Sequence, residues 1–351
     1  MSLFNQYLPE PSDPHGLEAD PPPRELGPIG VLLVNLGTPD QPTADGIRRY
    51  LAEFLSDARV IEIPQWIWWF ILHGIILRVR PRKLMPRYQG IWLENGSPLD
   101  VYSRVQAQAV QQHLQAAGHP VHVELAMRYG NPSVASAMAA LREKGCERIL
   151  TVPMYPQYAA STTATAVDAV CQQAGRMRNQ PELRFIKRYP TYEPYIQAMA
   201  DKAREHWAQH GKPERLLLSF HGLPKRTILQ GDPYHRDCME TARALRECLG
   251  EAAPPVYVSF QSRFGAEEWL QPYTEPTLKA WAQQGVRQVD VMCPGFLADC
   301  LETLEEIQVE CRDAFLEAGG TRFNYIACLN DDAQWSKGLA DLVRQHLGGW
   351  I

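Results

Sequence analysis

The 351-residue sequence predicts an α/β fold with two domains, each built around a doubly wound parallel sheet. Apolar runs of strand length alternate with longer segments of helical pattern along the chain, and this alternation is typical of parallel sheets. Residues 30–37 are almost entirely apolar, which fits a strand that is buried on both faces. The alternation begins again near residue 183, so we expect the two halves to share one architecture.

The first half opens with about 27 residues rich in proline and acidic side chains, which we predict to be a flexible arm. A strand then ends at the loop signal Gly37-Thr38-Pro39, and Asn95-Gly96-Ser97-Pro98 marks a second loop. The predicted strands are residues 30–37, 121–129 and 148–153, and the predicted helices are 43–55, the stretch up to 117, 133–144 and one that opens at 155.

The second half repeats the pattern. Its predicted strands are residues 183–189, 215–220, 256–260 and 286–293, and its predicted helices are 198–210, 234–249, 274–284 and one that follows Gly295. We therefore place the first domain at residues 28–190 and the second at 191–332. A closing helix at 333–347, within the tail 333–351, is expected to pack back on the first domain.

Composition excludes several classes of function. The chain is 45% hydrophobic and 21% charged, as in ordinary globular proteins, and its net charge of −5 with no basic tract argues against nucleic acid as a partner. Eight cysteines without a C-x-x-C pair fit neither a zinc ribbon nor the usual iron–sulfur patterns. Because the N-terminus lacks a signal-peptide pattern, we expect reduced thiols and a cytoplasmic location.

The second half ends in a strand and an acidic helix. Val289, Val291 and Cys293 have strand spacing, and Pro294-Gly295 is a turn signal. At about 100° per residue, four carboxylates fall within an arc of about 80° on the helix that follows: Asp299, Glu302, Glu306 and Glu310. One interpretation is a solvated outer face. The other is a ligand site that attracts a divalent cation, because open α/β sheets bind ligands where their strands end.

His221 follows the apolar strand 215–220, so in a parallel sheet it lies at the same edge as the acidic helix. A structural imidazole with satisfied hydrogen bonds is one interpretation, and a histidine that faces carboxylates across one crevice is the other. The surrounding sequence has neither the G-x-S-x-G context of a nucleophile elbow nor a Walker phosphate loop.

Residues 63–83 have the most unusual composition in the chain. Three clustered tryptophans, Trp66, Trp68 and Trp69, precede a basic group made of Arg78, Arg80, Arg82 and Lys83. The apolar part covers about a dozen residues, against about 20 needed to cross a bilayer, so no transmembrane helix is predicted. A core helix is one interpretation. The other is a segment that lies at a membrane surface or closes over a large, flat, apolar ligand.

A series of short motifs resembles the ferrochelatase family over about residues 28–332. The matching stretches, in order, are 34–39 (VNLGTP), 96–98 (GSP), 127–129 (MRY), 155–158 (YPQY), 219–224 (SFHGLP), 231–234 (GDPY), 260–265 (FQSRFG) with 269–270 (WL), and 294–306 (PGFLADCLETLEE). Members of that family insert ferrous iron into protoporphyrin IX in the last step of haem synthesis. The resemblance implies a chelatase-like fold of two Rossmann-like domains with the active-site cleft between them.

The resemblance also implies roles for single residues. His221 and Glu302 correspond to the catalytic and metal-contacting pair, and Asp299 and Glu306 to an acidic path for protons or metal. The residues that correspond to porphyrin-contacting positions are Leu36, Tyr88, Ser97, Arg128, Tyr158, Trp269 and Phe296. Trp66–Leu77 corresponds to the lip of the pocket, which implies peripheral contact with the inner membrane. Ferrous iron is then a substrate, and no permanently bound cofactor is expected.

Two departures from the family pattern are visible. Cys300 stands where some relatives have histidine, which leaves one imidazole fewer near Glu302. No cysteine follows Cys328, whereas cluster-containing relatives carry cysteines in a C-terminal extension, so a [2Fe–2S] cluster is not expected.

Two other functions stay open at this stage. One is a chelatase for another tetrapyrrole or metal, such as cobalt or nickel insertion into sirohydrochlorin. The other is a haem or porphyrin carrier without catalysis. The sequence also leaves open the choice between protoporphyrin and coproporphyrin, the choice between monomer and homodimer, and whether His221 or Glu302 binds iron first.

Overall fold

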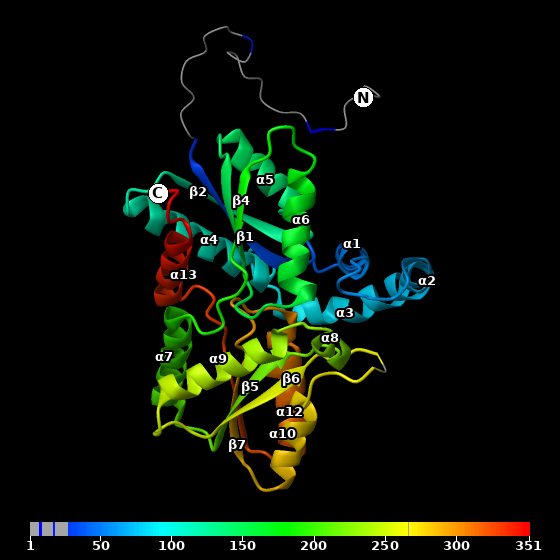
Figure 1. The fold of residues 1–351 in the computed structure, drawn as a ribbon. Coiled ribbons are helices and arrows are strands. Elements are labelled where there is room, and N and C mark those ends of the chain that lie inside the picture. The colour runs from blue at the N-terminus through cyan, green and yellow to red at the C-terminus, as the bar shows by residue number, and fades with distance from the viewer. Residues whose placement is uncertain (1–6, 9–16, 18–26, 266) are drawn as a thin grey trace.

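The computed structural model describes residues 7–8, 17, 27–265 and 267–351, and within them the strands form two four-stranded parallel sheets (Figure 1). The predicted flexible arm, residues 1–27, lies outside the described residues except for Tyr7, Leu8, Leu17 and Gly27. The α/β prediction with two parallel sheets is confirmed.

The first sheet has the order β2-β1-β3-β4, with strands β1 (Ile29–Gly37), β2 (Val121–Tyr129), β3 (Arg148–Pro153) and β4 (Glu182–Phe185). Its helical segments are α1 (Ala44–Leu55), α2 (Gln65–Ile71), η1 (Leu72–Ile76), α3 (Leu77–Ile91), α4 (Pro98–Ala116), α5 (Val134–Glu143), η2 (Ala160–Ala164) and α6 (Thr165–Ala174), where η marks a π-helical turn. Hydroxyl caps start three of the helices, since Thr43, Ser97 and Ser133 each accept a hydrogen bond from a backbone N–H of the first turn.

The second sheet has the order β6-β5-β7-β8, with strands β5 (Arg215–His221), β6 (Val256–Gln261), β7 (Gln288–Met292) and β8 (Arg322–Ile326). Its helical segments are α7 (Glu193–His210), α8 (Lys225–Leu229), α9 (Tyr234–Leu249), α10 (Thr274–Gln283), α11 (Leu301–Leu304), η3 (Glu306–Cys311), α12 (Arg312–Glu317) and α13 (Ala333–His346).

The two sheets share one topology. In each, the first strand pairs with the second on one side and with the third on the other, so the chain reverses its direction of winding between β1 and β3 and again between β5 and β7. Doubly wound sheets bind ligands at this reversal, outside the carboxyl ends of the strands. The molecule therefore has two candidate ligand edges, one in each half.

One apolar cluster joins the halves. It contains Val31 and Leu150 of the first sheet together with Leu218 and Phe220 of the second, all fully buried. Helix α13 contacts α4 and β3 of the first half and α7 of the second, so it packs along the seam as well as on the first half (Figure 1). The domain boundaries themselves stay a prediction.

Several elements differ from the sequence prediction. The helix expected to follow Gly295 begins only at Leu301, and the helix expected to open at residue 155 begins at Ala160. The short helix α8 and strand β8 were not predicted, and the strand expected at 183–189 in the second half is β4 of the first sheet. The tryptophan-rich segment is helical but contains the π-helical turn η1.

Candidate active site

A pocket of about 940 Å³ lies near the strand ends, and both halves line it. Its wall includes Leu36 at the end of β1, Tyr155 just after β3, His221 at the end of β5 and Phe296 just after β7. The two candidate ligand edges therefore face each other across one space. A volume of this size lies at the upper end of small-molecule sites.

His221 is the last residue of β5 and is half-buried in the pocket wall. Its Nδ1 lies 2.7 Å from the carbonyl oxygen of Gly222. Because a carbonyl can only accept, Nδ1 carries the hydrogen, and in the neutral ring Nε2 is left as the acceptor nitrogen. The hydroxyl of Tyr234 donates to the carbonyl of His221 over 2.9 Å, which fixes the backbone at this point.

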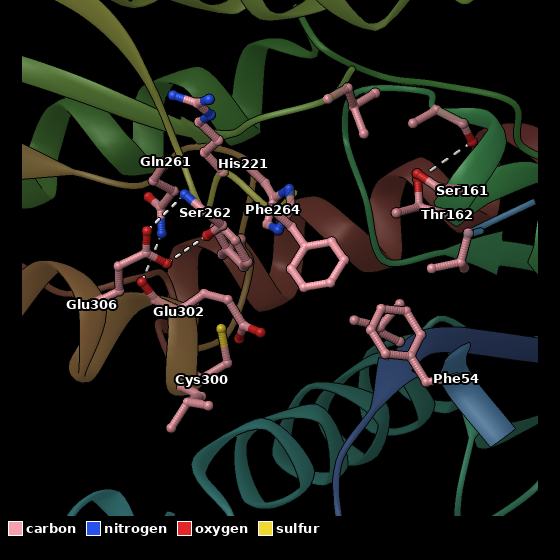
Figure 2. A pocket seen from close by; sticks show the side chains of 18 of the residues that line it. Phe54, Ser161, Thr162, His221, Gln261, Ser262, Phe264, Cys300, Glu302 and Glu306 are labelled. Carbon is pink, nitrogen blue, oxygen red and sulfur yellow. Dashed lines mark hydrogen bonds between the residues drawn. The ribbon is translucent and has the colours of Figure 1, made fainter. Parts of the chain in front are cut away.

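The glutamates of the acidic segment that line the same pocket include Glu302 on α11 and Glu306 on η3. The Glu306 carboxylate accepts hydrogen bonds from the backbone N–H of Ser262, over 2.7 Å, and from its hydroxyl. Burial raises the pKa of Glu306 and the charge of Glu302 adds to that rise, while Ser262 and His221 oppose it. Figure 2 shows His221, Ser262 and the two glutamates at one end of the pocket.

The π-helical turn η3 shapes this acidic wall. The N–H of Glu310 donates to the carbonyl of Glu305 over 2.9 Å, a bond that spans five residues rather than four. The wider turn keeps Glu302, Glu306 and Glu310 on the pocket wall. At the Glu310 end of this acidic wall, Arg87 of α3 pairs with Glu310 and lies 3.8 Å from Glu305. A cation from the first half therefore lies at the end of the row of glutamates.

Asp299 does not belong to this wall, and the prediction of one helical stripe from Asp299 to Glu310 is wrong at its first residue. The helix starts after Asp299, whose carboxylate is 3% exposed and points into the protein. It accepts hydrogen bonds from Thr303, Tyr325 and Asn330.

Of the residues expected to contact porphyrin, the pocket wall contains five: Leu36, Tyr88, Ser97, Trp269 and Phe296. The structure does not bring Arg128 or Tyr158 to this wall. Arg128 pairs with Asp57 and donates to the carbonyl of Thr165 over 2.9 Å. The ring of Tyr158 lies under the Lys187 amine at 5.0 Å.

The pocket also has lining residues that the sequence analysis did not single out. Those that are apolar or aromatic include Tyr50, Phe54, Ile61, Tyr155 and Phe264, and the cations are Arg59, Arg87, Arg226 and Arg263. Arg80, from the basic group named above, also lines the pocket. Tyr155, Arg263 and Phe264 lie inside motifs that the sequence does show, whereas Phe54 carries no signal beyond being apolar. In Figure 2, Phe54 reaches in from the side opposite the glutamates.

Two absences bear on the site and its surroundings. Within the ranges that the structure describes, no three His, Cys, Asp or Glu side chains converge closely enough to hold a metal ion. The helices of the same ranges include none with the length and apolar character needed to cross a bilayer.

Comparison with known proteins places the chain among close relatives. The model of the family described as "Ferrochelatase" matches residues 28–347. The ferrochelatase of Bordetella pertussis is 60% identical over 345 residues, which cover 98% of this chain and 95% of the relative. That of a Polaromonas species is 53% identical, with 98% and 93% covered. Among solved structures, SirB from Bacillus subtilis with Fe³⁺ aligns with a TM-score of 0.55 at 12% identity, covering 92% of this chain and 96% of SirB, which shows a shared fold.

Proposed function

The chain belongs to the ferrochelatase family, and from that membership we propose that the pocket lined by His221 and Glu302 is where it inserts ferrous iron into protoporphyrin IX. The protein is a ferrochelatase, a lyase of haem biosynthesis that exchanges two pyrrole protons for iron and gives protohaem. The observation that carries the assignment of the site is a histidine of fixed tautomer in the same pocket as two glutamates.

In this proposal His221 takes up a pyrrole proton. A neutral imidazole can accept a proton, and the Gly222 carbonyl leaves Nε2 as the nitrogen that accepts. The ring cannot turn over without losing its bond to that carbonyl. His221 is therefore oriented for one proton transfer rather than two alternative ones.

Glu302 and Glu306 supply negative charge on the acidic wall. Because burial raises the pKa of Glu306, its carboxyl keeps a proton to higher pH than an exposed glutamate does. Glu302 faces the same space and is placed to attract ferrous iron, and the row out to Glu310 gives iron and protons a polar route along the wall.

The rest of the pocket binds the macrocycle. Aromatic and aliphatic side chains from both halves, among them Tyr88, Trp269 and Phe296, offer flat apolar contact area. Arg80 lies in the same wall, and its positive charge complements the negative charge of a propionate group. Binding energy from these remote contacts is available to hold the ring in a reactive shape.

The test is the iron-dependent loss of free protoporphyrin absorbance under anaerobic conditions. We expect turnover by the wild type, and we expect His221→Ala to bind porphyrin without metallating it. His113→Ala, which changes an exposed histidine of α4, is the matched control and should be fully active. Porphyrin binding without any iron-dependent change in the wild type would instead identify a carrier.

We also propose that iron is only a substrate and that the protein carries no [2Fe–2S] cluster. The cysteine spacing supports this, since none of the eight cysteines forms a C-x-x-C pair. The visible spectrum of protein purified without air, together with acid-labile sulfide analysis, tests it. Sulfide at about two per chain would contradict it.

We further propose that the lip docks on the cytoplasmic face of an anionic membrane. Trp66 is 71% exposed, Phe70 66% and Ile75 61%, and the nearby Arg78, Arg82 and Lys83 are also exposed. Apolar and basic side chains on one short segment suit an interfacial position, and a mouth at the membrane would receive a poorly soluble porphyrin directly. Trp68 is excluded from this surface because it is 4% exposed and donates to the carbonyl of Leu55.

Flotation with phosphatidylglycerol vesicles tests the docking. The wild type should float with the vesicles at low salt and detach at high salt, and Trp66→Ser with Trp69→Ser and Phe70→Ser should abolish flotation. Val105→Ser with Leu316→Ser removes exposed apolar groups elsewhere and should float like the wild type. Unchanged flotation of the triple variant would contradict the docking proposal.

A further inference from the structure

Two non-glycine residues in the part of the chain that the structure describes have a left-handed backbone, Ser262 with φ of 66° and Asn330 with φ of 48°. This conformation is costly for residues other than glycine and persists where the surroundings enforce it. Ser262 holds the carboxylate of Glu306. Asn330 holds the carboxylate of Asp299 in the same way, although Asp299 is not in the pocket.

The contact between Asn330 and Asp299 is reciprocal. The Asn330 amide donates to the Asp299 carboxylate over 2.6 Å, and the backbone N–H of Asp299 donates to the Asn330 side-chain oxygen over 2.8 Å. Both side chains are nearly inaccessible, at 6% and 3% exposed. A buried pair of this kind satisfies all of its hydrogen bonds in one arrangement, so it fixes the position of the chain at residue 299.

The fixed carboxylate then holds the turn that carries Glu302. Asp299 accepts from the hydroxyl of Thr303 over 2.9 Å, and that hydroxyl accepts from the N–H of Cys300 over 3.0 Å. Helix α11 is only four residues long and has little stability of its own. Asp299 therefore helps to fix this first turn from inside the protein, while the amide of Gln261 donates to the carbonyl of Glu302 over 2.7 Å.

The same network reaches the first half of the molecule. The amide of Gln106, on α4, donates to the carbonyls of Leu297 and Asn330 over 2.9 and 2.6 Å. Gln106 is completely buried. Gln106, a side chain of the first half, thus holds the backbone at Leu297 and at Asn330, the two segments next to Asp299. Helix α4, which carries Gln106, has as its N-cap Ser97, a residue of the pocket wall.

From these contacts we infer that Asn330 and Asp299 are positioning residues for Glu302, with Gln106 tying their pair to the first half of the molecule. This inference rests on the proposed role of Glu302. Under this inference Asp299 positions Glu302 from inside the protein and does not lie in the path of metal or protons.

The test exchanges the two side chains. Asp299→Asn alone has one oxygen, and when that oxygen accepts from Thr303 and Tyr325 its NH2 group faces the NH2 group of Asn330. Asn330→Asp alone sets two carboxylates against each other, so each single change breaks the pair. Asp299→Asn combined with Asn330→Asp restores it, because the amide at 299 donates to the carboxylate at 330, which also accepts from the N–H of residue 299. Both Asn and Asp tolerate a left-handed backbone.

We expect each single variant to lower kcat about tenfold to a hundredfold, with the KM for porphyrin within about twofold, because displacement of a catalytic group by about 1 Å has an effect of that size. Asn330→Asp should regain activity as pH falls, since two adjacent carboxylates cannot both stay ionised. The double variant should recover kcat to within about threefold. An acid in the iron or proton path would give no such recovery from Asp299→Asn with Asn330→Asp.

Single variants with wild-type kcat, or a double variant that regains its Tm but not its kcat, would overturn the inference. If the single variants do not fold, Thr303→Val removes the hydroxyl that links Asp299 to the turn, and it should lower kcat with the porphyrin KM unchanged. Glu302→Gln is measured in parallel. Wild-type turnover by Glu302→Gln would refute the proposed role of Glu302, whereas an inactive Glu302→Gln with no effect of the exchange refutes only the positioning.

Discussion

His221 and His206 show how the neighbours of a histidine determine its environment. The Nδ1 of His221 donates to the Gly222 carbonyl, and its ring lies in the pocket wall. His206, on α7, lies 3.8 Å from the buried Asp290, and burial lowers its pKa. His221 therefore faces the pocket, whereas His206 is held beside a buried carboxylate of the protein.

Glu302→Gln should abolish most turnover, by about a hundredfold or more, with little change in Tm. The carboxylate faces the pocket rather than a packed core, so loss of its charge affects the reaction and not the fold. Glu317→Gln changes an exposed glutamate of α12 and should have no effect on either quantity. A variant that unfolds, yet has normal activity per folded molecule, would show that Glu302 is structural.

Glu306→Gln should raise Tm at neutral pH by about 1–3 °C, and the gain should shrink as pH falls toward the ordinary range of glutamate. Burial raises the pKa of the folded carboxyl, so ionisation above its unfolded pKa opposes folding, and this penalty is absent when both states are protonated. Glutamine removes the penalty and still accepts from the Ser262 N–H. Melting curves between pH 4 and 8 measure it, and a gain that is constant across that range would contradict it.

At the residue scale, the sequence predicted where a side chain lies when that depends only on the neighbouring residues in the chain. His221 was predicted at a strand end, and Glu302 and Glu306 on the helical face that the pocket uses. Asp299 was misplaced because the loop at 297–300 is held by Gln106 and Asn330, which come from distant parts of the chain. Those contacts leave no periodic pattern in the sequence of the segment itself.

At the scale of elements, the π-helical turns could not be predicted. A turn such as η3 differs from an α-helical one by one residue per hydrogen bond, and over five or six residues both fit the same apolar pattern. Helix α8 was missed for a related reason, since five residues are too few to show a period. Longer elements, such as α1, α5 and α9, were predicted to within about two residues.

The tryptophans of α2 give a test at this scale. Trp68→Phe should lower the free energy of unfolding by about 1–3 kcal/mol, because it leaves the buried carbonyl of Leu55 without its donor at 2.6 Å. Trp69→Phe, at a neighbouring position that is 55% exposed, should change it little. Thermal or urea denaturation compares the two. Equal destabilisation by both changes would show that α2 does not pack as the structure has it.

The molecule contains one sheet topology twice, and the two halves face each other across the pocket. The alternation of strands and helices was enough to predict two parallel sheets, because each parallel connection needs a helix-sized crossover. It was not enough to predict the strand orders, which put the reversals next to β1 and β5. The shared pocket follows from those orders, since residues after β1, β3, β5 and β7 all meet there.

Contacts between side chains also bridge the pocket mouth. Arg226 on α8 pairs with Glu62, which lies between α1 and α2, and it contacts Glu267 at 2.9 Å. Arg80 of α3 lies 4.7 Å from the ring centre of Phe264. Figure 1 shows α2, α3 and α8 projecting on the same side of the molecule. The ion pair is partly exposed, with 39% and 37% of the two side chains accessible, so salt should screen it.

Arg226→Gln should therefore leave Tm almost unchanged but speed the release of bound porphyrin at low salt. An exposed pair contributes about 0–1 kcal/mol, which corresponds to at most about a fivefold change in a rate. The wild type should release porphyrin faster as salt rises, and Arg226→Gln should be fast at every salt concentration. Lys337→Gln breaks an exposed pair on α13 at a distance from the pocket, and its release should match the wild type. Stopped-flow fluorescence measures the rates, and equal salt dependence in all three proteins would show that the pair does not hold the two halves together over the ligand.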